Sequence, residues 1–486
     1  MRDILIIGSG FSSLSSACYL AKAGYNVTIL EKNTSVGGRA RKFEKDGFKF
    51  DMGPTWYWMP DVFEKFFKDF DKKPSDFYQL EKLSPAYQVY FGKEDSITVP
   101  GTLNEIFDVF EKEEPGSSKH LKSFLDSAKF NYEVAINDLV YKPGESITEL
   151  INFTTLTKAN QFFTSISSAV RKKIKSSKLQ QILEFPVLFL GAKPSNTPSF
   201  YNFMNYADFG LGTWHPKGGM YEVVNGFVKL AKDLGVKIFT DQNVEKIVVE
   251  KGEIKGVVSN GYFIKSDIVI SGADYHHTET LLDANYRVYS EKFWNKKTFA
   301  PSALLFYVGF NKKIKNVAHH TLFFDTSFDV HAEDIYDTPK WPKDPLFYAS
   351  FSSITDASFA PDSKEAATFL IPIAPGLTDV PEVREEYFLK IMERLEHLTG
   401  QDLKDQVLFK ESYCVNDFVS DYNSYKGNAY GLANTLFQTA FLRPKIKSKK
   451  VENLFFTGQL TVPGPGVPPA IISGKIVSDM VINTSK

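Results

Sequence analysis

Two glycines and a glutamate near the start of the chain have the types and spacing needed to bind phosphates and a ribose. Gly8 and Gly10 directly follow a short apolar run, and Glu31 stands 21 residues after Gly10. The first glycine permits a tight strand-to-helix turn, the second lets backbone N–H groups approach a pyrophosphate, and the acid accepts hydrogen bonds from a ribose hydroxyl. Ser13 replaces the third glycine of such turns, which weakens helix–strand packing without abolishing it. The glycines alone would suit an ordinary turn, and Glu31 favours a dinucleotide.

The residues around this turn predict the elements that must position it. Residues 4–7 (ILII) form an apolar run typical of a strand buried on both faces. Residues 14–23 have apolar and small side chains at helical spacing, Gly24 is placed to end that helix, and residues 26–30 resume as a strand. The sequence therefore predicts a strand–helix–strand unit. Its expected contacts to the dinucleotide are Gly8, Gly10, Phe11, Ser12, Ser13, Glu31 and Lys32.

The segment that follows the acid separates NAD from FAD. Gly37 and Gly38 allow backbone to lie close to a second phosphate, and Arg39 offers a fork of donors to it. A double glycine plus arginine after the acid resembles the FAD signature of the amine oxidase-like flavoproteins. The expected cofactor is therefore FAD.

Further motifs resemble one branch of those flavoproteins, the phytoene desaturase-type carotenoid desaturases and their isomerase relatives. The matching segments are 46–55 (DGFKFDMGPT), 216–219 (PKGG), 235–247 with 267–274, and 453–472 (NLFFTGQLTVPGPGVPPAII), so the resemblance spans nearly the full chain. Besides Ser13, Gln459 and Leu460 depart from the small residues that many relatives carry. The resemblance implies further FAD contacts at Gly53, Pro54, Thr55, Val244, Gly458, Gly464, Gly466 and Val467.

The same resemblance implies an α/β architecture with two domains. A Rossmann-like FAD-binding domain with a mixed sheet would be discontinuous, built from residues 1–95, 215–285 and 445–486. Residues 96–214 and 286–444 would form an α+β substrate-binding domain, helix-rich in its first part and strand-rich in its second. Phe63, Phe66, Phe67 and Phe70 have the spacing of one helix face.

One helix could contact a membrane. Phe162, Ile166, Val170 and Ile174 repeat every four residues, and five basic residues share the segment. This pattern fits a helix lying on an anionic membrane surface around residues 150–185. It equally fits a solvated helix that packs one stripe into the core, and the sequence leaves both open.

Composition bounds the remaining possibilities. The chain has 486 residues, a formal net charge of −1 and two cysteines, Cys18 and Cys414, without metal-binding or disulfide spacing. No nucleic acid partner, disulfide framework or bound metal is expected. The two pairs of adjacent histidines, at 276–277 and 319–320, are poorly placed to chelate one metal ion. The start of the chain lacks signal-peptide features and no apolar run could span a bilayer. We expect a cytoplasmic protein that associates peripherally with a membrane.

The resemblance implies an FAD-dependent carotenoid desaturase of the phytoene desaturase type. It would remove hydrogen pairs from C–C bonds next to a polyene by hydride transfer to flavin N5. Asp208 and His215 are candidate catalytic groups because they precede the 216–219 turn, although a turn cap and a solvated histidine explain them equally well. With no second glycine-rich unit for NAD(P)H, the expected electron acceptor is oxygen or a quinone.

Three other functions remain open at this point. A desaturase acting later, at the 3,4 bond of a 1-hydroxycarotenoid, would share every motif. A carotenoid isomerase would use reduced flavin without net oxidation. A non-enzymatic prenyl-binding protein is the third, although Glu31, Arg39, Gly464 and Gly466 would then have no flavin to contact.

Overall fold

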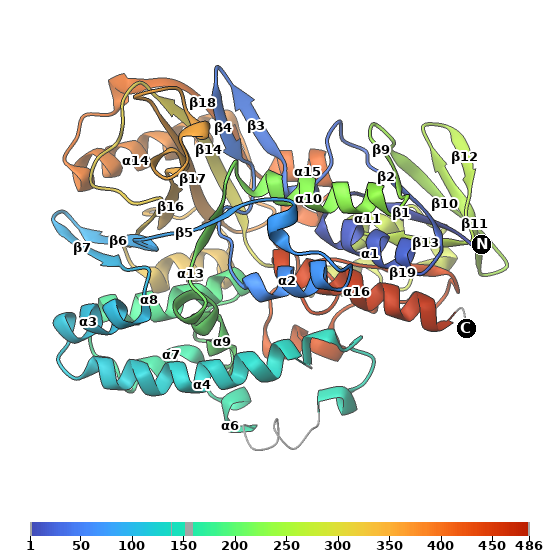
Figure 1. Ribbon diagram of the computed structural model, residues 1–486, viewed down its shortest axis with the longest axis horizontal. Coiled ribbons are helices and arrows are strands. Elements are labelled where there is room, and N and C mark those ends of the chain that lie inside the picture. The colour runs from blue at the N-terminus through green and yellow to red at the C-terminus, as the bar shows by residue number, and fades with distance from the viewer. Residues whose placement is uncertain (1, 138, 151–158, 485–486) are drawn as a thin grey trace.

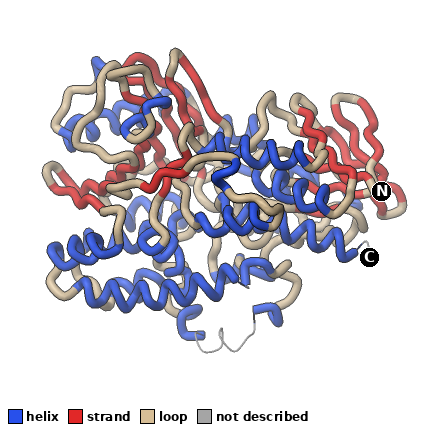
Figure 2. Tube along the Cα trace, in the orientation of Figure 1, coloured by secondary structure: helices blue, strands red, loops and turns tan. Residues whose placement is uncertain are grey.

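The computed structural model describes residues 2–137, 139–150 and 159–484. Figure 1 shows two groups of strands at opposite ends of an elongated molecule, with a layer of helices below one of them. Both chain termini lie at the end formed by the N-terminal sheet (Figure 1). The segregation of helices and strands is clearest in Figure 2.

The N-terminal sheet has five strands, and all of its pairings are parallel. In spatial order they are β19 (Leu454–Phe456), β13 (Ile268–Ser271), β1 (Asp3–Ile7), β2 (Asn26–Leu30) and β9 (Lys237–Phe239). The predicted strand–helix–strand unit is confirmed by β1, α1 (Phe11–Lys22) and β2. The predicted mixed sheet is corrected: this sheet is wholly parallel, and the antiparallel strands β10 (Val244–Glu250), β11 (Glu253–Ser259) and β12 (Tyr262–Lys265) form a sheet of their own.

The helices α10 (Met220–Asp233) and α16 (Val467–Thr484) pack beside α1. Close approach of α16 depends on Gly474, because a β-carbon there would lie 2.5 Å from the carbonyl oxygen of Ser12. The C-terminal helix α16 is therefore packed directly against the first turn of α1.

A second sheet of seven strands forms the other end of the molecule. Its order is β18 (Val407–Tyr413), β14 (Ser302–Phe310), β17 (Glu365–Ile373), β16 (Phe347–Ser350), β15 (His320–Phe323), β6 (Tyr87–Gly92) and β7 (Asp95–Val99). Because β6 pairs with β15, residues 87–92 belong to this sheet rather than to the predicted 1–95 segment. The helices α13 (Phe328–Tyr336) and α14 (Pro381–Thr399) pack with it.

The helical layer comes from the first predicted insertion. Its helices are α3 (Leu103–Glu113), α4 (Ser117–Asn137), α6 (Ala159–Phe163), α7 (Ile166–Arg171), α8 (Ser177–Glu184) and α9 (Phe203–Asn205). The proposed membrane stripe packs inward instead, since Ile166, Val170 and Ile174 are each at most 2% exposed. Arg171 of the same segment pairs with Glu184. Residues 151–158 of that prediction lie outside the described residues.

Shorter elements connect these layers. They are β3 (Lys42–Lys45), β4 (Phe48–Asp51), α2 (Pro60–Lys68), β5 (Leu80–Lys82), β8 (Trp214–Pro216), α11 (Tyr275–Thr280), α12 (Glu291–Asn295) and α15 (Val415–Tyr422). The predicted phenylalanine face is confirmed on α2, where Phe63, Phe66 and Phe67 are buried. Within the described part of the chain, no helix combines the length and apolar character needed to cross a membrane.

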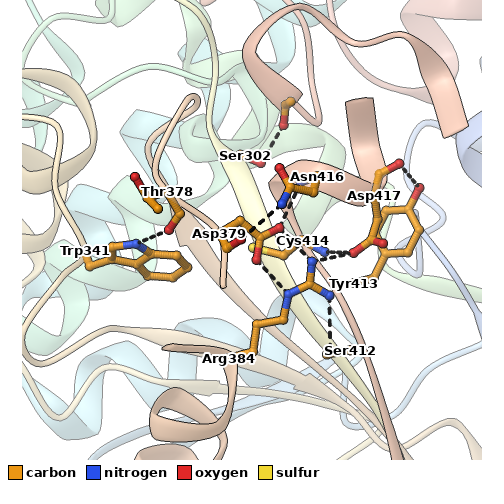
Figure 3. Close-up of polar contacts among 11 residues, drawn as sticks. Ser302, Trp341, Thr378, Asp379, Arg384, Ser412, Tyr413, Cys414, Asn416 and Asp417 are labelled. Atoms are coloured by element: carbon orange, nitrogen blue, oxygen red, sulfur yellow. Dashed lines mark hydrogen bonds and ion pairs between the residues drawn. The ribbon is translucent and has the colours of Figure 1, made fainter. Parts of the chain in front are cut away.

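An ion-pair cluster around the buried carboxylate of Asp379 fixes α15 against the second sheet (Figure 3). The carboxylate of Asp379 accepts two bonds from Arg384 on α14, at 2.7 and 2.6 Å. Arg384 also pairs with Asp417 on α15 at 2.8 Å and donates to Ser412 on β18 at 3.2 Å. A paired and hydrogen-bonded charge of this kind resists displacement, because removing one partner leaves the other uncompensated. The position of α15 matters because it borders the N-terminal turn.

Candidate functional site

The predicted glycine turn leaves open space at the start of α1. Gly8 has φ +86°, and Gly10, the residue before the helix, has no heavy atom within 4 Å of where its β-carbon would stand. The N–H groups of a helix N-terminus are a ready anion site when the approach is clear. The geometry of a pyrophosphate-binding turn is therefore present, with Phe11 packed edge-on against Phe227 below it.

Glu31 lies at the edge of this turn and is 4% exposed. Its carboxylate accepts the Ser9 N–H at 2.9 Å, the Ser9 hydroxyl at 2.6 Å and the Asn33 N–H at 2.9 Å. These bonds fix the side chain beside the turn and leave carboxylate lone pairs for a ribose hydroxyl. The main chain near Val244 also comes here, because the N–H of Gln242 donates to the Glu31 carbonyl.

Lys32, by contrast, turns away from the turn. Its ammonium donates to the Ser420 carbonyl at 2.6 Å on α15. Burial lowers the pKa of Lys32. The structure therefore gives this side chain a role in docking α15, and the predicted contact with a dinucleotide is reduced to its backbone.

The double glycine brings three separated backbone segments together. A β-carbon at Gly38 would lie 3.1 Å from the Cα of Gly10, and one at Gly53 would lie 2.0 Å from the carbonyl oxygen of Arg39. Gly37, at φ +108°, makes the turn between them. Ser12 lies next to Gly458, whose β-carbon would be 3.2 Å from the Ser12 hydroxyl. The predicted motifs at 8–13, 37–39, 53–55 and 458 thus lie next to one another around a single candidate binding site.

Arg39 is half-buried beside these motifs and lacks a full set of partners. It donates to the Ser424 hydroxyl at 2.9 Å and the Asn428 carbonyl at 3.3 Å, while its Nε has no partner among the described residues. Gln459 can also accept from it, at 3.1 and 3.3 Å. Burial lowers the pKa of Arg39. A guanidinium with a buried, unused donor suits a bound anion such as a phosphate.

An apolar cavity of about 370 Å³ begins where these motifs end. The predicted flavin contacts Gly53, Pro54, Thr55, Gly466 and Val467 all line it. Gly464 lies just outside the lining, against Asn434 and the buried Arg443. Aromatic and aliphatic residues from the helical layer and the second sheet make up most of the wall, including Trp56, Trp58, Phe185, Phe200, Leu322, Phe324, Ala332 and Leu346. A long apolar ligand fits such a wall.

A few polar groups face this cavity beside the predicted flavin contacts. The Tyr348 hydroxyl bonds Thr55 Oγ1 at 2.8 Å and His320 Nδ1 at 2.6 Å. The Tyr336 hydroxyl is buried and has no partner among the described residues. Nothing in the sequence spacing of either tyrosine marks it as a site residue. The adjacent histidines at 319–320 stand out in the sequence only as a pair unsuited to binding a metal.

The two candidate catalytic residues do not line the cavity. Asp208 is 2% exposed and accepts a bond from the Tyr87 hydroxyl at 2.9 Å, behind the wall. Burial raises the pKa of Asp208 to about 7. His215 is also buried and lies 3.4 Å from the carboxylate of Asp356. Among the described residues, no group of three or more His, Cys, Asp or Glu side chains is arranged to hold a metal.

Comparison with known proteins gives matches over nearly the whole chain. Residues 11–482 match the family described as flavin containing amine oxidoreductase. A carotenoid 3,4-desaturase of Haloarcula japonica is 42% identical over 99% of this chain and 98% of its own, and a zeta-carotene-forming phytoene desaturase of Myxococcus xanthus is 28% identical over 99% and 94%. A crystal structure of an oxidoreductase from Methanosarcina mazei has the same fold, with TM-score 0.63, 17% identity and coverage of 98% and 100%.

The residues in place fit FAD. The turn at Gly10 is open, Arg39 has a free donor where a phosphate would lie, and the 53–55 and 466–467 segments meet at the head of an apolar cavity. An adenine dinucleotide would span from Glu31 past Gly10 to that cavity.

Proposed function

The chain belongs to the family of flavin-containing amine oxidoreductases, and we propose that it acts on carotenoids as an FAD-dependent desaturase. The observation that carries the substrate class is the apolar cavity, which starts at the predicted flavin contacts and is lined by aromatic side chains from two domains. Two desaturases among the matching relatives support the same class.

FAD would be held by the residues that surround the glycine turn. Glu31 would bind the ribose, and backbone at Gly8, Gly10 and Gly38 would contact the pyrophosphate together with Arg39. Backbone at 53–55, 458 and 464–467 would lie against the flavin. When bound there, FAD supplies the electron acceptor for C–H cleavage, which no side chain can supply.

The cavity wall holds one C–C bond of the substrate in place and excludes water. Trp56, Trp58 and Phe185 present ring faces and edges near Thr55, and burial of apolar surface on them supplies the binding free energy. Most side chains of the cavity wall carry no hydrogen-bond donor. The C–C bond that reacts is therefore set by how deep the carotenoid enters the cavity. Cavity length therefore determines regiospecificity.

Two substrate types fit this wall. Phytoene, a pure hydrocarbon, matches its apolar character, and a phytoene desaturase is among the relatives. A 1-hydroxycarotenoid desaturated at the 3,4 bond is the second, favoured by the relative at 42% identity. The unpartnered Tyr336 hydroxyl also favours it, because a substrate hydroxyl would satisfy that group.

The decisive experiment is anaerobic incubation of the purified flavoprotein with phytoene and, separately, with a 1-hydroxycarotenoid. Bleaching of the flavin together with loss of two hydrogens per step identifies the desaturated substrate. A product of unchanged mass would identify an isomerase. Purified protein that is colourless and cannot be reconstituted with FAD would overturn the proposal in favour of prenyl binding.

Delivery of such a substrate requires contact with a membrane surface. Phe163 and Phe437 are 83% and 79% exposed. Their segments are joined through the turn Ser199–Asn202, whose Ser199 N–H bonds the Thr164 carbonyl and whose Tyr201 hydroxyl bonds Thr439. Thr439 lines the cavity, so this apolar surface lies beside it. Peripheral attachment through these two rings predicts that Phe163→Ser with Phe437→Ser releases the protein from sedimenting liposomes.

Reoxidation of the flavin would use oxygen or a membrane quinone. The sequence has no second glycine-rich strand–helix turn of the GxGxxG type for NAD(P)H. A requirement for stoichiometric NADPH in anaerobic turnover would contradict this proposal.

A further inference from the structure

A buried cluster of histidines lies between the cavity and the partly exposed carboxylate of Asp356. Of the eight histidines in the chain, His215, His319 and His320 pack together, with ring centroids 4.7 Å apart for His215 and His319 and 4.5 Å apart for His319 and His320. All three are at most 3% exposed. Burying three imidazoles side by side is costly, so the arrangement calls for a physical reason.

The inner end of the cluster reaches the cavity through one hydroxyl. His320 Nδ1 is 2.6 Å from the Tyr348 hydroxyl, which lines the cavity and lies 2.8 Å from Thr55 Oγ1. The His320 ring stacks on Trp56 with centroids 4.0 Å apart and planes at 10°. This stacking fixes the ring orientation and keeps Nδ1 directed at Tyr348.

The outer end reaches a charged carboxylate. His215 Nε2 lies 3.4 Å from Asp356 Oδ2, and the Asp356 side chain is 13% exposed. The bond from His215 and backbone N–H groups hold the pKa of Asp356 well below its usual range, so this group is a carboxylate at every working pH. His319, which packs between His215 and His320, has its Nδ1 in a hydrogen bond of 2.9 Å with the Thr355 hydroxyl.

Two ring nitrogen atoms inside the histidine cluster make no hydrogen bond to the described residues. The Nε2 atoms of His319 and His320 have no hydrogen-bond partner among the residues that the structure describes. Burial and the neighbouring imidazoles hold the pKa of both histidines well below the usual value, so both are neutral at rest. A neutral His320 can accept a proton on Nδ1, the nitrogen that faces the Tyr348 hydroxyl. Asp51 also faces this group, and burial raises its pKa to about 6.

We propose that Tyr348 and His320 form a relay that takes up the proton released during desaturation, with His319 and His215 as positioning residues, an inference that rests on the proposed function. In that reaction two C–H bonds break and one C=C bond forms. One hydrogen leaves with its electron pair to oxidised FAD, and the other leaves as a proton. Tyr348 is the catalytic residue that takes this proton on its oxygen while passing its own to His320 Nδ1. The proton then rests on the His320 imidazole. His319 packs against His320 and His215 packs against His319, so both are positioning residues.

The test measures the rate of anaerobic flavin reduction by whichever carotenoid the wild-type protein desaturates. Tyr348→Phe and His320→Ala should each slow this step about 100-fold or more, the contribution typical of positioned acid–base groups. FAD content and the substrate concentration for half-saturation should stay unchanged. Added imidazole should restore the rate of His320→Ala, since the vacated space beside Trp56 matches an imidazole, whereas a structural role would not be restored by it.

Controls separate this relay from the desaturase assignment itself. His276→Gln, which alters a histidine on α11 that pairs with Glu291 on α12, should leave the rate unchanged. Wild-type protein that reduces no flavin with any carotenoid would overturn the proposed function. Active wild-type protein with normal rates in both Tyr348→Phe and His320→Ala would overturn only the relay. A slow His320→Ala variant that imidazole fails to restore, with normal Tyr348→Phe, would also overturn it.

Discussion

The hydroxyl of Ser13 occupies the space that a β-carbon on Gly272 would need. A β-carbon built on Gly272 would lie 2.0 Å from Ser13 Oγ, but 3.4 Å from Ser13 Cβ and 3.5 Å from the Ile7 carbonyl oxygen. Gly272 directly follows β13, the neighbour of β1. The close contact that other dinucleotide turns obtain from a third glycine on the helix is therefore obtained here from a glycine on the adjacent strand end.

The first prediction tests the close contact between Ser13 and Gly272. Gly272→Ala should destabilise the protein by about 1–3 kcal/mol through overpacking and should weaken FAD retention. Ser13→Ala, which removes a buried hydroxyl without a partner, should be neutral or stabilising. The double variant should recover most of the loss, because only ordinary contacts remain. Denaturation midpoints of the four proteins form the cycle, and strictly additive effects would contradict the contact.

The Ser13 position illustrates which parts of the fold could be predicted. The unit at residues 3–30 was predictable because strand burial, turn glycines and helical spacing are all local properties of the sequence. The partner of Ser13 was not, since Gly272 is 259 residues away and only the parallel pairing of β1 with β13 brings it near. The same reason explains β6, whose assignment to the second sheet depends on pairing with β15.

The second prediction concerns FAD retention. Glu31→Ala and Arg39→Ala should each weaken FAD binding about ten- to a hundredfold, since a hydrogen bond to a charged group is worth about 1.5–3 kcal/mol. Lys32→Ala should retain FAD normally, because that side chain bonds the Ser420 carbonyl on α15. Flavin content after dialysis measures all three. Equal FAD loss in the Lys32 variant would show that its ammonium contacts the cofactor.

Some residues of the candidate site could likewise be predicted from the local sequence, whereas others depend on contacts between distant segments. Glycines at 8, 10, 37, 38 and 53 could be predicted because each is required by its own turn or by close backbone approach. His215 was selected for its place before the 216–219 turn, but its relation to His319 and His320 depends on the pairing of distant segments. Tyr348 had no signal at all, because a tyrosine in a β-strand is ordinarily a packing residue.

The third prediction concerns a substitution that shortens the cavity. Ala332 lies on α13, is 5% exposed and lines the cavity. Ala332→Phe should fill part of the space that a long polyene needs and should lower turnover at least tenfold, while the flavin spectrum and FAD content stay normal. Ala332→Ser is the matched control of similar size. Undiminished activity of the Phe variant would place the substrate elsewhere.

The last prediction follows from the ionisation of Asp208. Burial raises the pKa of this carboxyl from 3.8 to about 7, so the folded protein holds a proton between about pH 4 and pH 7 that the unfolded chain has released. Stability therefore falls as pH rises through this window, by about 4 kcal/mol for one such group. Asp208→Asn keeps the shape and can still accept from the Tyr87 hydroxyl, but it carries no charge at any pH.

The variant should accordingly gain stability over the wild type at pH 8 and little or none at pH 4. Asp51 titrates in the same range, which affects both proteins equally, so the quantity to measure is the difference between their urea midpoints at each pH. A difference that does not change with pH would mean that the folded protein ionises Asp208 as readily as the unfolded chain does. Because Asp208 lies behind the cavity wall, FAD content should be the same in both proteins at pH 8. Loss of flavin from the variant would instead assign Asp208 a part in shaping the site.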